Sequence, residues 1–216
     1  MTARVLDHVT IGCASLAQGI AYVRERLGVE VPAGGQHPRM GTHNRLMQVG
    51  DSVYLELIAI DPDAPPPGRP RWYALDEPWQ QARIAERPRP IAWIVRSSNI
   101  AADLTAHPEL GTPEEMTRGD LVWRISLRRD GVLPARGLLP VLIEWPSGSP
   151  AARMPDLGVR LTRLRLCSDG SGDSKALDAT LTRLGKPHAV ELSQTSGDRH
   201  LELDLRLPSG ATVTLK

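Results

Sequence analysis

Apolar residues near the start of the chain first follow the two-residue period of a strand and then the longer period of a helix. Residues 4–12 are rich in β-branched side chains, which predicts a strand. The apolar positions that next recur on one helical face are Leu16, Ile20, Val23 and Leu27. Ser15 is suited to cap this helix and Gly28 to end it, so the helix is expected at 16–27.

Three further strands, expected at 29–31, 45–49 and 53–60, give the first sixty residues the element order βαβββ. Residues 61–90 contain eight prolines, which excludes a sheet there, although a short helix fits 77–87. The same order then restarts twice, at intervals of about 70 residues. The later elements are expected as strands at 91–95, 116–117, 121–127, 138–145, 160–167, 189–193, 200–207 and 212–215, and as helices at 100–107 and 174–184.

This repetition predicts an α+β fold in which helices cover one face of curled, largely antiparallel sheets. Residues 1–150 are expected to form one domain of paired βαβββ units. A third, partial unit at 156–216 is expected to pack on that domain, after a linker rich in proline and glycine at 146–158.

Composition narrows the class of protein. The 216 residues are 41% hydrophobic and 24% charged, which suffices to bury a core. The net charge of +1 favours neither nucleic acid nor an anionic membrane as a partner. Cys13 and Cys167 lack the spacing of a disulfide framework or a zinc site. Without a long apolar stretch or a signal-peptide pattern, a cytoplasmic protein is expected.

Three polar residues stand in otherwise apolar strands: His8, Glu56 and Glu144. Alternation places Glu56 on the face opposite the apolar one that should meet the helices, and Glu144 is expected at the matching place of the second unit. A lone carboxylate in a low dielectric is unfavourable. The two carboxylates therefore either share a metal ion or pair separately with arginines, which dominate the basic residues.

The repeated unit, with "LDHV" on its first strand and a glutamate on its last, resembles the vicinal oxygen chelate superfamily. That superfamily contains glyoxalase I, extradiol dioxygenases and the bleomycin- and fosfomycin-resistance proteins. The resemblance to its glyoxalase-like group covers most of residues 4–146 and is carried by "GGQHPRMGTHNRLMQVGDSVYLELIAIDP", "IAWIVR", "MTRGDLVWRISL" and "LIEW". It implies a curled mixed sheet around a cavity, with both halves supplied by one chain, so a monomer or a homodimer is expected.

The resemblance also implies metal ligands on the first and last strands of each unit. A divalent metal, Zn²⁺, Mn²⁺ or Fe²⁺, would then be bound by His8, Glu56 and Glu144. The fourth ligand position falls at Ala92 or Trp93, which cannot bind a metal, so His43 is the candidate replacement.

Further candidates come from the glycine-rich loop at 36–44 and from the second unit. Catalytic roles are expected for Glu56, Glu144 and His43, and substrate binding for His37, Asn44, Arg118, Trp93 and Trp123. Simpler interpretations stay open: His43 begins a strand, Trp123 belongs to the core, and Arg118 is a solvated turn residue. The face of Trp145 favours a core position.

Two functions fit this sequence. The first is a metal-dependent enzyme of the lyase, isomerase or dioxygenase type, acting on a small molecule with vicinal oxygens. The alternative is a metal-free protein that binds or sequesters a small molecule in the same cavity.

Overall fold

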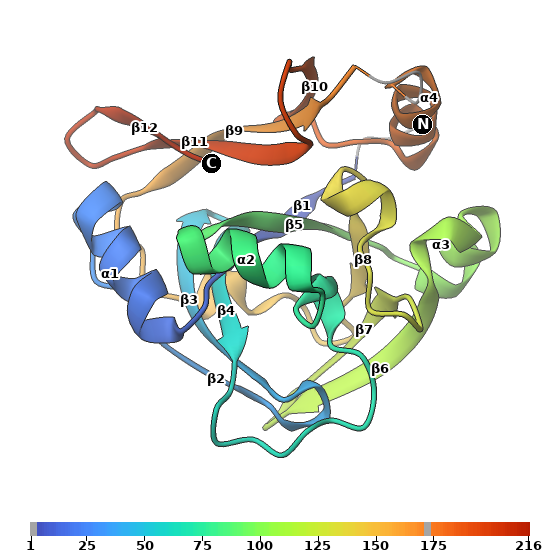
Figure 1. Ribbon diagram of the computed structural model, residues 1–216, viewed down its shortest axis with the longest axis horizontal. Coiled ribbons are helices and arrows are strands. Elements are labelled where there is room, and N and C mark those ends of the chain that lie inside the picture. The colour runs from blue at the N-terminus through green and yellow to red at the C-terminus, as the bar shows by residue number, and fades with distance from the viewer. Residues whose placement is uncertain (1–3, 171–173) are drawn as a thin grey trace.

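The computed structural model describes residues 4–170 and 174–216, which form two sheets and four α-helices (Figure 1). The helices are α1 (Leu16–Leu27), α2 (Pro78–Glu86), α3 (Ile100–Ala106) and α4 (Ser174–Leu184). The strands are β1 (Leu6–Gly12), β2 (Ala33–His37), β3 (Thr42–Gly50), β4 (Val53–Ile60), β5 (Arg89–Arg96), β6 (Thr112–Arg118), β7 (Leu121–Leu127), β8 (Val141–Glu144), β9 (Arg160–Ser168), β10 (Val190–Gln194), β11 (His200–Arg206) and β12 (Thr212–Leu215).

Eight strands form one curled sheet in the order β2-β3-β4-β1-β5-β8-β7-β6. The first four strands come from one βαβββ unit and the last four from the second, in mirrored order. The units meet at β1 and β5, which pair antiparallel, while each of these strands pairs in parallel with the last strand of its own unit. The predicted α+β fold with paired units in a curled mixed sheet is therefore confirmed.

Local signals explain why the helices begin and end where they do. Ser15 accepts a hydrogen bond from the backbone of Gln18, and Asn99 does the same for Ala102 at the start of α3. Gly28 ends α1 with a φ of 70°, a conformation that favours glycine. The helices are 7 to 12 residues long, and none within the described ranges is long and apolar enough to cross a membrane.

The curled sheet has an apolar core on each face. The convex face packs against α1 and α3 through residues such as Val9, Leu55 and Leu142. The concave face carries a second cluster that includes Ile58, Ile94 and Ile143. Because side chains of a strand alternate between faces, the concave face is where the remaining polar side chains of β1 and β4 must lie.

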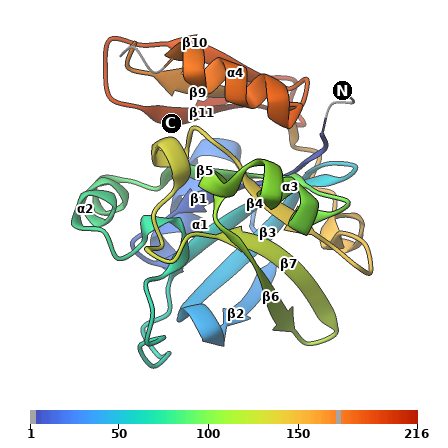
Figure 2. The same ribbon diagram turned by 90° about the vertical axis from the view of Figure 1, so that its right-hand side faces the viewer.

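The third unit forms a separate sheet in the order β10-β9-β11-β12. Figures 1 and 2 place this sheet, with α4, as a layer above the curled sheet. Its leucine face joins the convex core through Leu164, Leu203 and Leu205. The element order repeats that of the first two units, but the strand order does not: here the first and second strands pair in parallel on either side of the α4 crossover.

Several predicted elements differ from the observed ones. No strand forms at 29–31, and β2 lies instead at Ala33–His37, within the segment read as a loop. Gly34 allows this strand to approach its neighbour, because a Cβ there would lie 2.1 Å from the backbone oxygen of Asn44. β6 spans seven residues where two were expected, and β8 is shorter than expected. The helix at 16–27 and the strand at 212–215 have their predicted bounds.

Candidate functional site

A small pocket opens on the concave side of the curled sheet, where the two units meet. Its polar walls come from β1, β2, β3, β4 and β6, and its aromatic walls come from β7, the end of β8 and the turn at Trp72–Ala74. The lining residues are His8, His37, Asn44, Leu46, Tyr54, Glu56, Trp72, Tyr73, Arg118, Trp123, Ile125, Ile143, Trp145 and Pro150.

His8 lies on the pocket wall as part of a buried pair with Asp7. His8 Nδ1 donates to Asp7 Oδ1 at 2.7 Å, so in the neutral ring Nε2 carries the lone pair. Asp7 is fully buried and also accepts from Arg96 Nε (2.6 Å) and from Trp145 Nε1 (3.1 Å). Burial alone would raise the pKa of Asp7, but the hydrogen bonds and charges of His8 and Arg96 lower it below its ordinary value. Asp7 is therefore an anion that holds the ring of His8 in one orientation.

The carboxylate of Glu56 faces His8 from the neighbouring strand. Asn44 Nδ2 donates to its Oε1 at 2.7 Å, and Thr10 Oγ1 donates to its Oε2 at 3.0 Å. His8 Nε2 lies 3.7 Å from Oε2, and the His8 ring stacks on Tyr54 with 4.4 Å between centroids. Both oxygens of this buried carboxylate thus have a donor, while His8 Nε2 stays available for a further partner.

Asn44 connects Glu56 to a second polar group formed by His37 and Arg118. Its amide nitrogen also approaches His37 Nε2 (3.4 Å), and its oxygen accepts from Arg118 Nη1 (3.2 Å) and from the backbone of Gly35 (2.9 Å). Arg118 reaches this place because Gly35 has no side chain: a Cβ there would lie 2.8 Å from Arg118 Cδ. Burial, with a contribution from the Arg118 charge, lowers the pKa of His37 to about 4, so His37 is neutral at physiological pH.

Aromatic side chains close the pocket. Trp72 packs edge-on against His37, and Trp123 packs against Trp145. Tyr73 and Ala74 have φ values of 59° and 58°, which non-glycine residues seldom adopt. This strained turn is held by a hydrogen bond from the Ala74 backbone to Gly131 (2.8 Å). Burial and the charge of Glu56 raise the pKa of Tyr73 well above its ordinary value, so its phenol keeps its proton.

The structure brings most of the predicted pocket residues together. His8, His37, Asn44, Glu56, Arg118 and Trp123 all line the pocket. Trp145, expected in the core, also lines it and donates to Asp7. Trp93 lies instead in the convex core, and His43 is half-buried on the other side of β3, 3.9 Å from Asp61.

Glu144 does not lie in the pocket, so the prediction that this residue faces the concave side is wrong. Ile143 and Trp145 point into the concave side, so Glu144 points out of it. Its carboxylate accepts from the backbone of Ile100 at the start of α3 (2.8 Å) and from Arg124 (3.1 Å). It therefore pairs with an arginine, as the simpler interpretation of a strand carboxylate allowed.

The donors in the pocket do not fit the metal centre implied by the resemblance. Among the described residues, one group of three metal-binding side chains has ligand atoms close enough to share an ion. This group lies in the small sheet and not in the pocket. The first unit supplies His8, His37 and Glu56 to the pocket. Glu56 already accepts two hydrogen bonds, and His37 Nε2 faces the Asn44 amide and the Arg118 guanidinium. From the second unit the pocket receives Ile125 and Ile143, which cannot bind a metal.

Two parts of this site escaped the sequence analysis. Asp7 alternates away from His8 along an ideal strand, but the pairing of β1 with β5 is irregular between Leu6 and His8, and the two side chains meet. Trp72 and Tyr73 lie in the proline-rich segment, where no strand or helix pattern pointed to the pocket. The available signal was the pair of adjacent aromatic residues in an otherwise polar loop.

The chain is similar in sequence or in structure to several known proteins. The sequence profile of a family described as a glyoxalase-like domain matches residues 6–185. A hypothetical protein from Staphylococcus aureus has a similar structure, with 12% identity, a TM-score of 0.63 and 98% of each chain covered. A methylmalonyl-CoA epimerase from Streptomyces coelicolor is 18% identical, with a TM-score of 0.45, covering 68% of this chain and 99% of its own. The epimerase from Mycobacterium tuberculosis is 16% identical, with a TM-score of 0.41 and coverages of 67% and 90%. No curated protein matches the chain.

Proposed function

This chain belongs to the family of glyoxalase-like domains, and from that premise we propose that it is a small-molecule enzyme whose concave pocket transfers a proton. The observation that carries the proposal is the orientation of His8. Its Nδ1 is bound to the buried Asp7, and its Nε2 faces the pocket 3.7 Å from the Glu56 carboxylate. An imidazole held by a buried carboxylate is the arrangement by which a histidine accepts and returns a proton.

The rest of the pocket suits a substrate with adjacent oxygen atoms. The Arg118 guanidinium borders the pocket and keeps donors beyond the one it gives to Asn44, so it can bind a substrate carboxylate. Trp72 also lines the pocket, and its buried indole N–H has no hydrogen-bond partner among the described residues, so it is a second donor that a substrate oxygen could use. The aromatic walls exclude water and strengthen these interactions.

The proposed reaction breaks a C–H bond next to a carbonyl group. His8 Nε2 takes the proton, and the electron pair of that bond moves to the carbonyl oxygen as an enolate. Asp7 stabilises the imidazolium that forms, and the charge of Arg118 favours the anionic intermediate. Return of the proton to carbon gives an isomer or epimer, and no atom is gained or lost. Because the donor set does not fit a metal, no step of this scheme uses one.

Deuterium exchange tests the proposal. We expect the protein, incubated in D₂O with a panel of small 2-oxo and 2-hydroxy acids, to exchange the carbon-bound hydrogen of at least one of them, as followed by NMR. His8→Gln should slow this exchange by a factor of about 10² or more, the ordinary contribution of a general base. Arg118→Met should weaken binding of the same acid.

The matched control is Glu144→Gln, which alters a carboxylate outside the pocket and should leave exchange unchanged. Exchange that survives in His8→Gln would contradict the proposed base. A ligand that binds the pocket without any exchange would instead support the second candidate, a binding protein. That candidate is favoured by the apolar second-unit wall of Ile125 and Ile143.

A further inference from the structure

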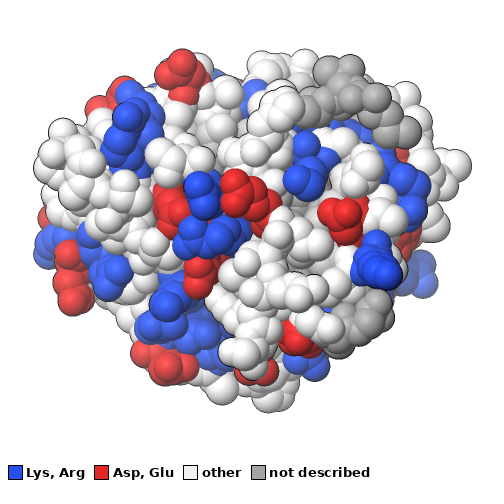
Figure 3. Space-filling view, turned by 90° about the horizontal axis from the view of Figure 1, so that it is seen from above, with Lys and Arg blue, Asp and Glu red and all other residues white. Residues whose placement is uncertain are grey.

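A second group of chemically active side chains lies on the small sheet, away from the concave pocket. The leucine face of this sheet packs on the rest of the protein, and the opposite face is polar. Looking onto this layer, Figure 3 shows positive and negative side chains intermixed. Arg165, Glu202 and Asp204 belong to this outer face and form ion pairs with one another.

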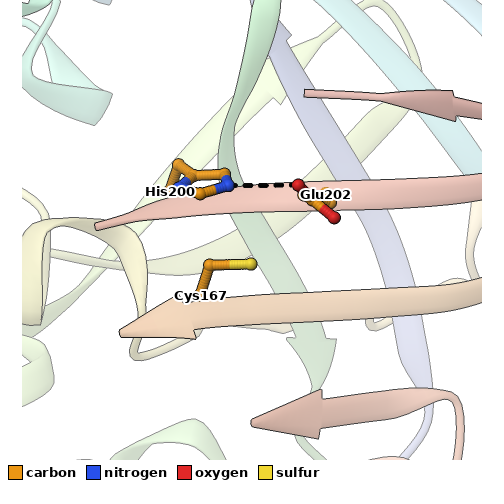
Figure 4. A group of neighbouring side chains, drawn as sticks. All are labelled: Cys167, His200 and Glu202. Carbon is orange, nitrogen blue, oxygen red and sulfur yellow. Dashed lines mark hydrogen bonds and ion pairs between the residues drawn. The ribbon is translucent and has the colours of Figure 1, made fainter. Parts of the chain in front are cut away.

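Cys167, His200 and Glu202 converge on this face. Cys167 on β9 is paired in register with His200 on β11, and Glu202 follows two residues later on the same side of β11. One ligand atom of each residue lies within 4.8 Å of the other two. Figure 4 shows the sulfur, the ring nitrogen and the carboxylate turned toward a common point.

The hydrogen bonds of His200 prepare it to accept a cation. Its Nδ1 donates to the backbone oxygen of Asp198 at 2.7 Å, so Nε2 carries the lone pair in the neutral ring. Nε2 faces Glu202 Oε1 at 3.2 Å, and two acceptors at that distance need a positive charge between or upon them. A carbonyl on the far nitrogen is also the usual way in which a metal-binding histidine is held.

Glu202 directs one oxygen, Oε1, toward His200 and the same point. Arg165 donates to Glu202 Oε2 through Nε and Nη2, at 2.9 and 2.7 Å, which leaves Oε1 toward His200. Asp204 also binds Arg165, so the arginine charge is balanced by a second carboxylate rather than by Glu202 alone. The local charges therefore do not oppose a divalent ion.

We propose that Cys167, His200 and Glu202 form a Zn²⁺ site. A thiolate, an imidazole and a carboxylate are ligands of Zn²⁺, and three protein ligands leave a fourth position for water. Binding breaks the S–H bond of Cys167, forms a Zn–S bond and releases the proton to solvent. His200 and Glu202 lie beyond the residues matched by the family profile, and none of the three proposed ligands lines the concave pocket.

Metal titration of the full chain tests this site. Freed of metal with a chelator and then dialysed against Zn²⁺, the protein should retain one equivalent by elemental analysis. With Co²⁺ as a spectroscopic substitute, a sulfur-to-metal charge-transfer band should appear. Cys167→Ser should lose the band, and His200→Gln and Glu202→Gln should each weaken binding at least tenfold.

Two control variants match the chemistry of the ligands. Cys13→Ser alters the other cysteine, and His188→Gln alters an exposed histidine; both should bind Zn²⁺ like the unchanged protein. Circular dichroism checks that each variant is folded. The proposal is overturned if the chain retains no stoichiometric Zn²⁺, or if Cys167→Ser binds it unchanged. Loss of the metal in His8→Gln with retention in Cys167→Ser would place it in the concave pocket instead.

Discussion

The two halves of the curled sheet share a backbone plan but differ in what they place on the concave face. In the antiparallel pair of β1 and β5, His8 lies opposite Ile94, and Thr10 lies opposite Ala92. A two-fold axis between these strands therefore exchanges His8 with Ala92 and Thr10 with Ile94. On the outer neighbours of this pair, Glu56 lies opposite Thr10, and Val141 lies opposite Ile94.

The counterparts of His8, Thr10 and Glu56 in the second half are thus Ala92, Ile94 and Val141. The convex face shows no such difference, since both halves bury apolar side chains there against a helix capped by serine or asparagine. Packing against helices constrains one face of every unit, whereas the face toward the pocket is free to diverge. The acids and histidines that line the concave pocket accordingly all come from the first half.

The largest effect on stability is expected when Val141, the counterpart of Glu56 in the second half, is replaced by glutamate. Val141→Glu places a carboxylate where neither a threonine nor an asparagine can donate to it, unlike Glu56. The free energy of unfolding should fall by about 3–5 kcal/mol, as for an uncompensated buried charge, measured by urea denaturation at pH 7. Ile143→Val is the control and should cost only about 0.5–1.5 kcal/mol. A loss below about 1 kcal/mol in Val141→Glu would show that both halves accommodate a carboxylate.

A smaller effect on stability is expected when the pH is lowered, because the first half buries His37 in its neutral form. The pKa of His37 is about 4 in the folded protein and near 6.5 when exposed, so the unfolded state binds more protons between these values. Stability from neutral His37 is complete above pH 6.5 and is lost as the pH falls to 4, by about 3 kcal/mol. Denaturation of the wild type and of His37→Gln at pH 7 and pH 4 measures it: the variant should lose less on acidification. Equal losses in the two proteins would show that His37 is not held neutral.

The smallest effect on stability is expected from a substitution of Glu144, which the two-fold axis does not relate to Glu56. Glu144→Gln keeps an oxygen for the Ile100 backbone and loses only a half-exposed ion pair with Arg124. The midpoint of urea denaturation should shift by an amount equivalent to less than about 1 kcal/mol. Ligand binding in the pocket should not change. Abolished binding would return Glu144 to the site.

Much of this architecture could be predicted from the sequence because it depends on local patterns. The period of apolar residues, the cap at Ser15 and the glycine at 28 predicted the first helix with its observed bounds. The place of Glu56 was also accessible, because β4 is long and regular enough for alternation to identify its inner face. The family resemblance then implied that His8 and Glu56 share a site, and the glycine-rich loop at 36–44 offered Asn44 as a further candidate.

What the tertiary structure alone decided depends on register and on contacts between distant segments. β8 has four residues, and a shift of one position reverses its faces, so alternation could not tell Ile143 from Glu144 as the inner residue. The meeting of Asp7 with His8 required an irregular strand pair, and that of Trp72 and Tyr73 with the pocket required a loop without a periodic pattern. Cys167 is 33 positions from His200 along the chain, and only the pairing of β9 with β11 places them side by side. Spacing along a sequence reports neighbours within one element, whereas pairing between strands decides which side chains can share a proton or an ion.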